Sequence, residues 1–105
     1  MIFSERSIAL IMAGKKTQTT RLKEPRVKVG GIYSIKRNWF RKENFGRIRV
    51  ISKESTALKR FSASDLKREG YKNLATFKEA LEKINRTKIS LNRIVWKVVF
   101  KYIPS

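Results

Sequence analysis

One stretch near the end of the chain alternates between two faces, as a half-buried strand does: Arg93-Ile94-Val95-Trp96-Lys97-Val98-Val99-Phe100-Lys101-Tyr102. The apolar and aromatic face carries Ile94, Trp96, Val98, Phe100 and Tyr102, and the other face mixes cations with valines. We therefore predict a strand over residues 93–102, with Trp96 in the core because it shares the apolar face.

Three shorter strands are predicted upstream. Residues 32–37 and 47–51 contain apolar residues in alternation with polar ones, and a loop of eight or nine residues centred on Trp39 joins them. The pair Ile2 and Phe3 predicts a short strand at the start of the chain.

Helical spacing and capping residues predict three helices. The first begins after Ser4, with Glu5 in its first turn, and ends before Gly14. The second is short, is capped by Ser62 or Ser64, and ends near Gly70. The third carries apolar residues at three- and four-residue steps: Leu74, Phe77, Ala80, Leu81 and Ile84.

The predicted order is strand, helix, two strands, two helices and a final strand. A chain of 105 residues arranged in this way predicts one α+β domain over residues 1–105, with a curled and mostly antiparallel sheet. The pattern alone leaves open whether this sheet closes into a barrel.

The composition excludes several kinds of chemistry. The chain has no Cys and no His, which excludes a thiol nucleophile, a thiolate zinc site, a serine triad and a histidine base. Acid–base chemistry must therefore come from Glu, Asp, Lys or Tyr. With only 8 acidic residues spread along the chain, we expect no metal site and no cofactor.

No apolar run approaches the ~20 residues that span a bilayer, and the start of the chain lacks the apolar stretch of a secretory signal. No long amphipathic helix with a wide apolar face is predicted either. We expect a soluble, cytoplasmic protein that has no membrane partner.

The charge balance predicts a polyanionic partner. Lys and Arg number 26 against 8 acidic residues, so the formal net charge is +18. Solubility requires only about 2–8 charges on a small domain, whereas phosphate backbones reward a large excess through counterion release. A solvated basic surface is the alternative. A DNA-binding module also stays open on charge alone, although no recognition helix after a glycine turn is predicted.

One basic segment combines several chemical groups just after the predicted end of the first helix: Gly14-Lys15-Lys16-Thr17-Gln18-Thr19-Thr20-Arg21. Lys16 and Thr19 are three residues apart, so one turn of helix-like backbone would bring them to the same side. Arg21 would share the face of Thr19 if the chain then extends. Such a group could bind a phosphate, or Lys16 could activate the hydroxyl of Thr19; a solvated loop is the alternative.

This segment and two later ones resemble the signature of the ASCH domains. The matching motifs are Gly14-x-Lys16-x-x-Thr19-x-Arg21, Lys28-Val29-Gly30 and Glu69-Gly70-Tyr71, and the order of elements matches over nearly the entire chain. The resemblance implies a PUA-like fold, which is a small β-barrel with flanking helices and a cleft that faces RNA or a nucleoside.

The resemblance also implies two functions. ASCH domains are associated with RNA, and some members are enzymes that hydrolyse N4-acetylcytidine or act as ribonucleases. In the amidohydrolases the catalytic group corresponds to Lys16, Thr19 and Glu69 here. Thr19 would attack the acyl carbon, Lys16 would take or hold its proton, and Glu69 would pass a proton to the departing amine. The charge excess favours RNA over a free modified nucleoside as the partner.

Residues 36–47 mix three aromatic side chains with five cations between two predicted strands. Unstacked RNA bases stack on aromatic faces while cations follow the phosphates, although Trp39 could instead pack the end of this hairpin onto the core. The predicted nucleic-acid-binding residues are Lys15, Lys16, Arg21, Arg37, Trp39, Arg41 and Lys42.

Overall fold

The computed structural model describes all 105 residues of the chain. Its elements are α1 (Glu5–Met12), β1 (Gln18–Arg21), β2 (Ile32–Ser34), β3 (Arg47–Ala57), the short 3-10 helix η1 (Leu58–Arg60), α2 (Ala63–Glu69), α3 (Leu74–Asn85) and β4 (Ile94–Ile103). The three predicted helices and the final strand are confirmed. In place of the predicted first strand, Ile2 forms a single parallel bridge with Lys36.

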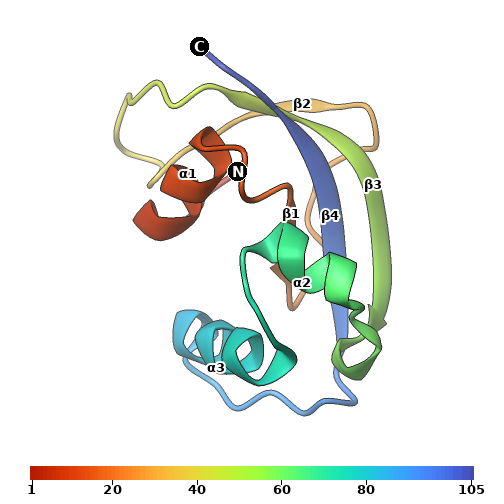
Figure 1. Cartoon of the computed structure of the whole chain (residues 1–105). Coiled ribbons are helices and arrows are strands. Elements are labelled where there is room, and N and C mark those ends of the chain that lie inside the picture. The colour runs from red at the N-terminus through yellow and green to blue at the C-terminus, as the bar shows by residue number, and fades with distance from the viewer.

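The four strands form one antiparallel sheet in the order β1-β4-β3-β2 (Figure 1). β1 and β2 are its two edges and do not pair with each other, so the sheet is open and the predicted barrel is wrong. The physical reason is that each edge strand pairs on one side only, β1 with β4 and β2 with β3, so no backbone hydrogen bonds join the two edges.

β3 continues beyond the predicted residues 47–51, and a bulge explains why the sequence pattern does not show this. Val50 pairs with Phe100 and Ser52 pairs with Val99, which leaves Ile51 as the extra residue, exposed to solvent. A bulge reverses which side chains face the core, so the alternation that predicts residues 47–51 does not continue. The polar residues beyond it nevertheless pair with β4 as far as Ala57.

Both faces of β4 are packed, which corrects the prediction for Trp96. Val95 packs with Phe77 on the side of α2 and α3, whereas Phe100 lies on the opposite face in a cluster with Ile8 of α1. Trp96 is only half-buried, and the Lys53 ammonium lies 5.7 Å from the centre of its ring. Alternation of apolar residues alone therefore does not identify the core face of this strand.

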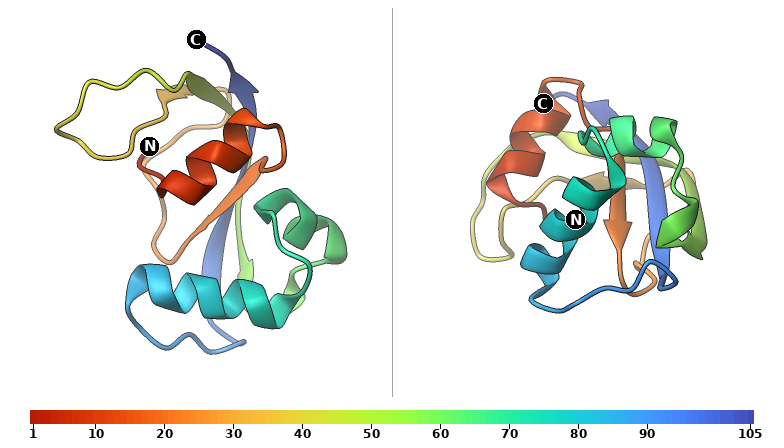
Figure 2. Two further views of the ribbon diagram at one scale, coloured as in Figure 1. Left: turned by 60° about the vertical axis from the view of Figure 1, so that its left-hand side comes forward. Right: turned by 60° about the horizontal axis from the view of Figure 1, so that its bottom comes forward.

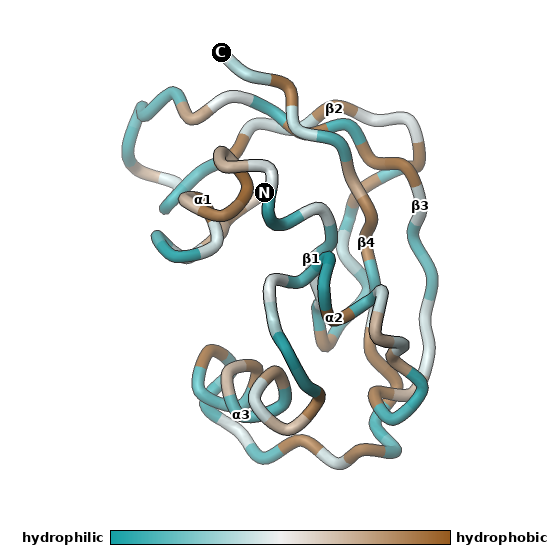
Figure 3. The backbone as a smooth tube through the Cα atoms, viewed as in Figure 1, coloured by the Kyte–Doolittle hydropathy of each residue, from teal (hydrophilic) through white to brown (hydrophobic).

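The helices lie at different places on the sheet. In Figure 1, α1 lies at the upper left and α3 at the lower left. α2 lies against β1, and its Asp65 accepts a hydrogen bond from Lys97 of β4. The connection between β2 and β3 extends beyond α1, as the left panel of Figure 2 shows. Brown and teal alternate within each turn of α3 in Figure 3, and its buried residues are Phe77 and Leu81. No helix is long and apolar enough to cross a membrane.

Candidate functional site

Glu69 occupies the last position of α2, and the caps of this helix determine where its side chain lies. Ser62 and Asp65 form a capping box at the start of the helix, and Gly70 ends it with a φ of 87°. The Glu69 side chain then points toward β1, and the residue is only 1% exposed.

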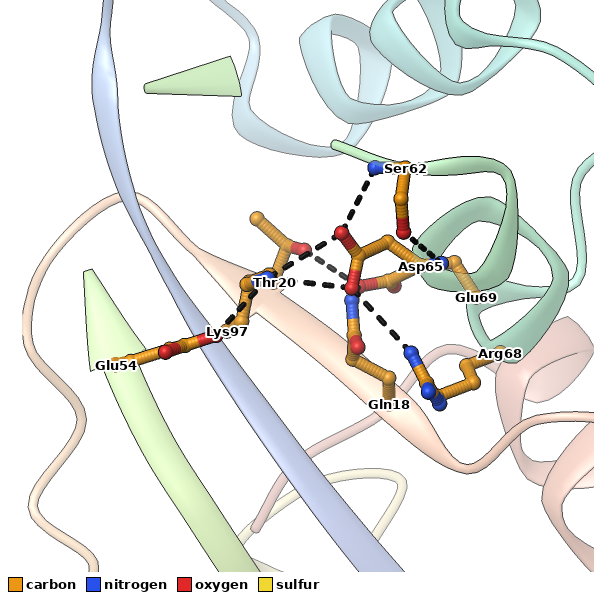
Figure 4. Close-up of polar contacts among 8 residues, drawn as sticks. All are labelled: Gln18, Thr20, Glu54, Ser62, Asp65, Arg68, Glu69 and Lys97. Atoms are coloured by element: carbon orange, nitrogen blue, oxygen red, sulfur yellow. Dashed lines mark hydrogen bonds and ion pairs between the residues drawn. The ribbon is translucent and has the colours of Figure 1, made fainter. Parts of the chain in front are cut away.

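Three donors from alternate residues of β1 and its approach surround the Glu69 carboxylate. Lys16 Nζ lies 3.1 Å from Oε1, while Gln18 Nε2 and Thr20 Oγ1 donate to Oε2 at 3.0 and 2.5 Å. Figure 4 shows Gln18 and Thr20 meeting this carboxylate. Because the backbone is extended here, residues 16, 18 and 20 share a face.

Both partners of the Lys16–Glu69 ion pair are buried, since Lys16, like Glu69, is almost completely covered, with 5% of its surface exposed. Removing two charges from water costs free energy that their attraction repays only when further hydrogen bonds complete the geometry. Gln18 and Thr20 supply those bonds. Buried ionisable groups of this kind, at the edge of a cavity, are candidates for a functional site.

A cavity of about 290 Å³ lies beside this pair, and we refer to it as the central cavity. Its polar lining includes Lys16, Thr19, Thr20, Arg21 and Glu69, and α3 supplies an apolar wall. Its volume lies near the lower limit of small-molecule sites, which is about 300 Å³. The structure therefore brings the sequence-predicted Lys16, Thr19, Arg21 and Glu69 together at one cavity.

Thr19 and Arg21 lie on the face of β1 opposite Gln18 and Thr20. Thr19 is 6% exposed, and its hydroxyl makes no hydrogen bond within the protein. Arg21 donates from Nη2 to the carbonyl of Ile2 at 2.8 Å, and its Cζ lies 5.2 Å from the Phe3 ring centre. Burial lowers the pKa of Arg21, and the charge of Glu69 only partly opposes this.

A second buried carboxylate lies one turn before Glu69. Asp65 accepts hydrogen bonds from the Ser62 N–H and from Lys97 Nζ, at 2.9 and 3.2 Å (Figure 4). Burial opposes its ionisation, but these hydrogen bonds outweigh burial and lower the pKa of Asp65. Burial likewise opposes the charge on Lys97, yet the hydrogen bonds to Glu54 and Asp65 raise its pKa.

Two basic hollows adjoin the central cavity. The Lys15 hollow shares Tyr71 with the cavity and is lined by four cations: Lys15, Lys67, Arg68 and Lys72. The Trp39 hollow shares Ile2, Arg21 and Asn85 with the cavity and is also lined by Lys23, Arg26, Arg93 and Trp39. No acidic residue lines either hollow.

The predicted residues of the β2–β3 connection take different positions. Trp39 is 67% exposed, with Lys36 Nζ 5.9 Å from its ring centre, so it does not pack the hairpin onto the core. Arg37 lines the central cavity but also pairs with Glu5 and Glu43, and their hydrogen bonds raise its pKa. Arg41 and Lys42 are exposed and line none of the three spaces.

Charge is distributed unevenly over the whole chain. All eight acidic residues form ion pairs, and these pairs occupy seven of the 26 Lys and Arg side chains. The other 19 cations have no carboxylate within 4 Å. No group of three acidic residues could hold a metal ion.

The sequence reasoning missed Gln18 and Thr20, which hold Glu69 in place. Lys16 and Thr19 were expected to meet through a helix-like turn, but the chain from Gln18 onward is a strand. In an extended backbone every second side chain lies on the same face. An extended chain from Lys16 onward would therefore have placed Gln18 and Thr20 on the same face as Lys16.

Several solved structures share this fold. An ASCH domain from Lactobacillus crispatus JV V101 superposes with a TM-score of 0.77 at 19% identity, over 95% of this chain and 72% of that one. Protein EF3133 from Enterococcus faecalis V583, of family-model DUF984, gives a TM-score of 0.64 at 17% identity, over 94% and 71% of the two chains. Hypothetical protein PH0355 gives 0.70 at 17% identity, over 96% and 94%.

No family model matches the sequence, and no curated protein matches it. At this level of identity the similarity is one of fold. The chain therefore has the ASCH-domain fold that its motifs predict.

Proposed function

We propose that this chain, which has the ASCH-domain fold, is an RNA-binding domain of ASCH type. The observation that carries the proposal is the distribution of charge: every carboxylate is paired, while 19 cations are not. Several of the unpaired cations line the two hollows that adjoin the central cavity. A ligand with repeated negative charges would supply the missing partners.

The shape of the site favours an unpaired strand over a duplex. The central cavity is small and combines hydrogen-bonding groups with the apolar wall of α3, which suits a nucleobase removed from its stack. The exposed ring of Trp39 offers a stacking face, and the surrounding cations would follow the phosphates.

The first prediction concerns salt. We expect the logarithm of the association constant for a single-stranded RNA to fall linearly with the logarithm of salt concentration, by about 0.7 for each neutralised phosphate. Fluorescence anisotropy with a labelled RNA measures it, with duplex DNA as a competitor at matched ionic strength. The Lys15→Gln variant should reduce the slope. Lys83→Gln is the control, because Lys83 already pairs with Glu79 and lines none of the three spaces.

An affinity that stays constant between about 50 and 200 mM salt would contradict RNA binding, since phosphate contacts cannot be insensitive to salt. Tighter binding of duplex DNA than of RNA would instead favour the DNA-binding alternative.

A second candidate is a hydrolase, and it is favoured because the buried Lys16–Glu69 pair and Thr19, whose hydroxyl has no partner in the protein, line the same cavity. Thr19 Oγ1 would attack the acetyl carbon of N4-acetylcytidine, and its proton would pass to the Lys16–Glu69 pair. That proton would return to the N4 amine as the C–N bond breaks, and water would then release acetate from Thr19. A ribonuclease would use the same three residues.

The second prediction uses two neighbouring threonines to distinguish a catalytic role from a structural one. If the protein is a hydrolase, Thr19→Val abolishes release of cytidine without lowering stability, because the Thr19 hydroxyl makes no bond within the protein. Thr20→Val removes a donor to Glu69 and should lower the free energy of unfolding by about 1–3 kcal/mol. Lys16→Ala and Glu69→Gln should also abolish turnover.

Chromatography of cytidine and of RNA fragments measures turnover, and chemical denaturation measures the free energy of unfolding. If the wild-type protein turns over neither acylated nucleosides nor RNA, the hydrolase candidate is excluded and the binding function is unaffected.

A further inference from the structure

Arg21 lies at the junction between the central cavity and the Trp39 hollow. It lines both spaces, as do Ile2 and Asn85. The Arg21 guanidinium is the only charged group that the two spaces have in common. A ligand that occupied both would therefore pass beside it.

Only part of the hydrogen-bonding capacity of Arg21 is used within the protein, through the bond from Nη2 to the Ile2 carbonyl. Its Nε is fully buried and has no partner, and no carboxylate lies within 4 Å of the guanidinium. Only one other buried side-chain nitrogen or oxygen lacks a partner, Gln18 Oε1, and it also belongs to β1. Arg21 is half-buried as a residue, but a buried donor without a partner costs free energy and calls for an explanation, such as a role in binding a ligand.

The residues that line the Trp39 hollow suit the adjoining unit of a polymeric ligand whose first unit occupies the central cavity. Its volume is about 690 Å³, more than twice that of the central cavity. Besides Arg21, three cations line it (Lys23, Arg26 and Arg93), and the rings of Tyr33 and Trp39 supply aromatic surface. Cations and aromatic faces together are typical of sites for single-stranded nucleic acid.

We propose that Arg21 binds the phosphate that links two successive nucleotides of a single-stranded RNA. One base lies in the central cavity, and the next lies against Trp39 in the adjoining hollow. This deepens the proposed RNA-binding function and rests on it. The guanidinium of Arg21 suits a phosphate because it is planar, stays charged and can donate two parallel hydrogen bonds.

Two observations favour a linking phosphate over a free phosphate or a lone nucleoside. A free phosphate would leave both adjoining spaces empty, although each has the lining of a base site. A nucleoside in the central cavity would leave the Arg21 guanidinium without an anion. A dinucleotide step fills both spaces and supplies the anion between them.

The third prediction is tested by isotope-resolved NMR titration of the whole chain with cytidine, cytidine monophosphates and the dinucleotide cytidylyl-uridine. For the wild type we expect the dinucleotide to bind at least about tenfold more tightly than cytidine, and to shift both the Arg21 Nε–H and the Trp39 indole N–H signals. Arg21→Gln should remove this gain, whereas Arg49→Gln should retain it. Arg49 is an exposed, unpaired arginine that lines none of the three spaces.

Because Arg21 also bonds to Ile2, two further variants guard against a folding defect. Arg21→Lys keeps the charge but loses the fork and should recover only part of the gain. Trp39→Ala alters an exposed residue and should weaken the dinucleotide but not cytidine.

The outcomes are distinguishable. If the dinucleotide gains nothing over cytidine, or if a folded Arg21→Gln keeps the gain, the proposal is overturned while salt-dependent binding of longer RNA stands. If the wild-type protein binds no RNA of any length, the proposed function fails, and this assignment fails with it.

Discussion

The Glu69 carboxylate connects the stability of the fold to the candidate chemistry. It is the shared acceptor for Lys16, Gln18 and Thr20, so it joins α2 to β1 as well as lining the central cavity. A glutamine in its place would bring two hydrogens toward three donors and leave some of them unpaired. Loss of activity in Glu69→Gln alone therefore cannot identify a catalytic role, which is why the variants of Thr19 and Thr20 carry the test.

Asp65, one turn earlier in α2, gives a fourth prediction that concerns pH. Its pKa is lowered from the ordinary value of 3.8, because hydrogen bonds from Ser62 and Lys97 outweigh the effect of burial. A group whose pKa is lower in the folded state contributes stability above its unfolded pKa and loses it as the pH falls through the folded value. We therefore expect the free energy of unfolding to decrease below about pH 4.

The Asp65→Asn variant should lack this contribution. At neutral pH it should be less stable than the wild type by about 1–3 kcal/mol, and the difference should shrink as the pH falls below about 4. Lys97 does not affect this acid range, since its raised pKa matters only above its ordinary value of 10.5. Glu82, whose pKa is lowered by the Ile89 N–H, leaves some pH dependence in the variant.

Urea denaturation at a series of pH values measures this effect. The control is Glu54→Gln, which removes the exposed partner of the same lysine and should change stability by no more than about 1 kcal/mol. Equal losses in the two variants at neutral pH would show that burial of Asp65 is not what makes it important.

At the residue scale, motif spacing predicted the members of the site better than their geometry. Lys16, Thr19, Arg21 and Glu69 do line one cavity. The sequence could not reveal that Thr20, and not Thr19, donates to Glu69. That depends on whether the backbone between residues 16 and 20 is helical or extended.

At the element scale, β1 explains why that backbone could not be predicted. Its four residues, from Gln18 to Arg21, are all polar and show no alternation of apolar side chains. Pairing with β4 and burial under α2 make it a strand. Local propensity is a weak guide where tertiary contacts supply the hydrogen bonds. The helices were predictable because their caps and apolar spacing are local: Ser4 and Ser62 both accept the expected capping bonds.

β3 and β4 show a second limit on prediction at this scale. The bulge at Ile51 changes which residues face the core, and β4 is packed on both faces. A pattern with period two identifies a strand, but it identifies a core face only when one side of the strand is exposed. Whether short edge strands close a barrel depends on the distance between them, and neither length nor pattern encodes that distance.

At the scale of the whole molecule, the excess of cations opposes folding. All eight acidic residues are already paired, so no carboxylate remains to balance the other 19 Lys and Arg side chains. Like charges held together on a small domain repel one another and destabilise the compact state. A bound polyanion relieves this repulsion and stabilises the folded chain by mass action. Added salt relieves it too, but salt competes with the polyanion.

This competition gives the fifth prediction, that salt has opposite effects on stability and on RNA affinity. Raising KCl from about 0.01 to 0.1 M shortens the screening length from about 30 to 10 Å, so the melting temperature of the free protein should rise by several degrees. Over the same range the affinity for RNA should fall. Differential scanning calorimetry and anisotropy follow the two effects in the same buffers. The control is the double variant Lys59→Glu, Arg60→Glu, which changes two exposed, unpaired cations of η1 outside the three spaces.

That variant lowers the net charge from +18 to +14, because each substitution exchanges a positive for a negative charge. With less repulsion to screen, it should melt at a higher temperature than the wild type in low salt and should respond less to added KCl. A wild-type melting temperature that falls as KCl is added would mean that the nine ion pairs contribute more to stability than the unpaired cations subtract. In that case the charge excess would no longer require an anionic partner.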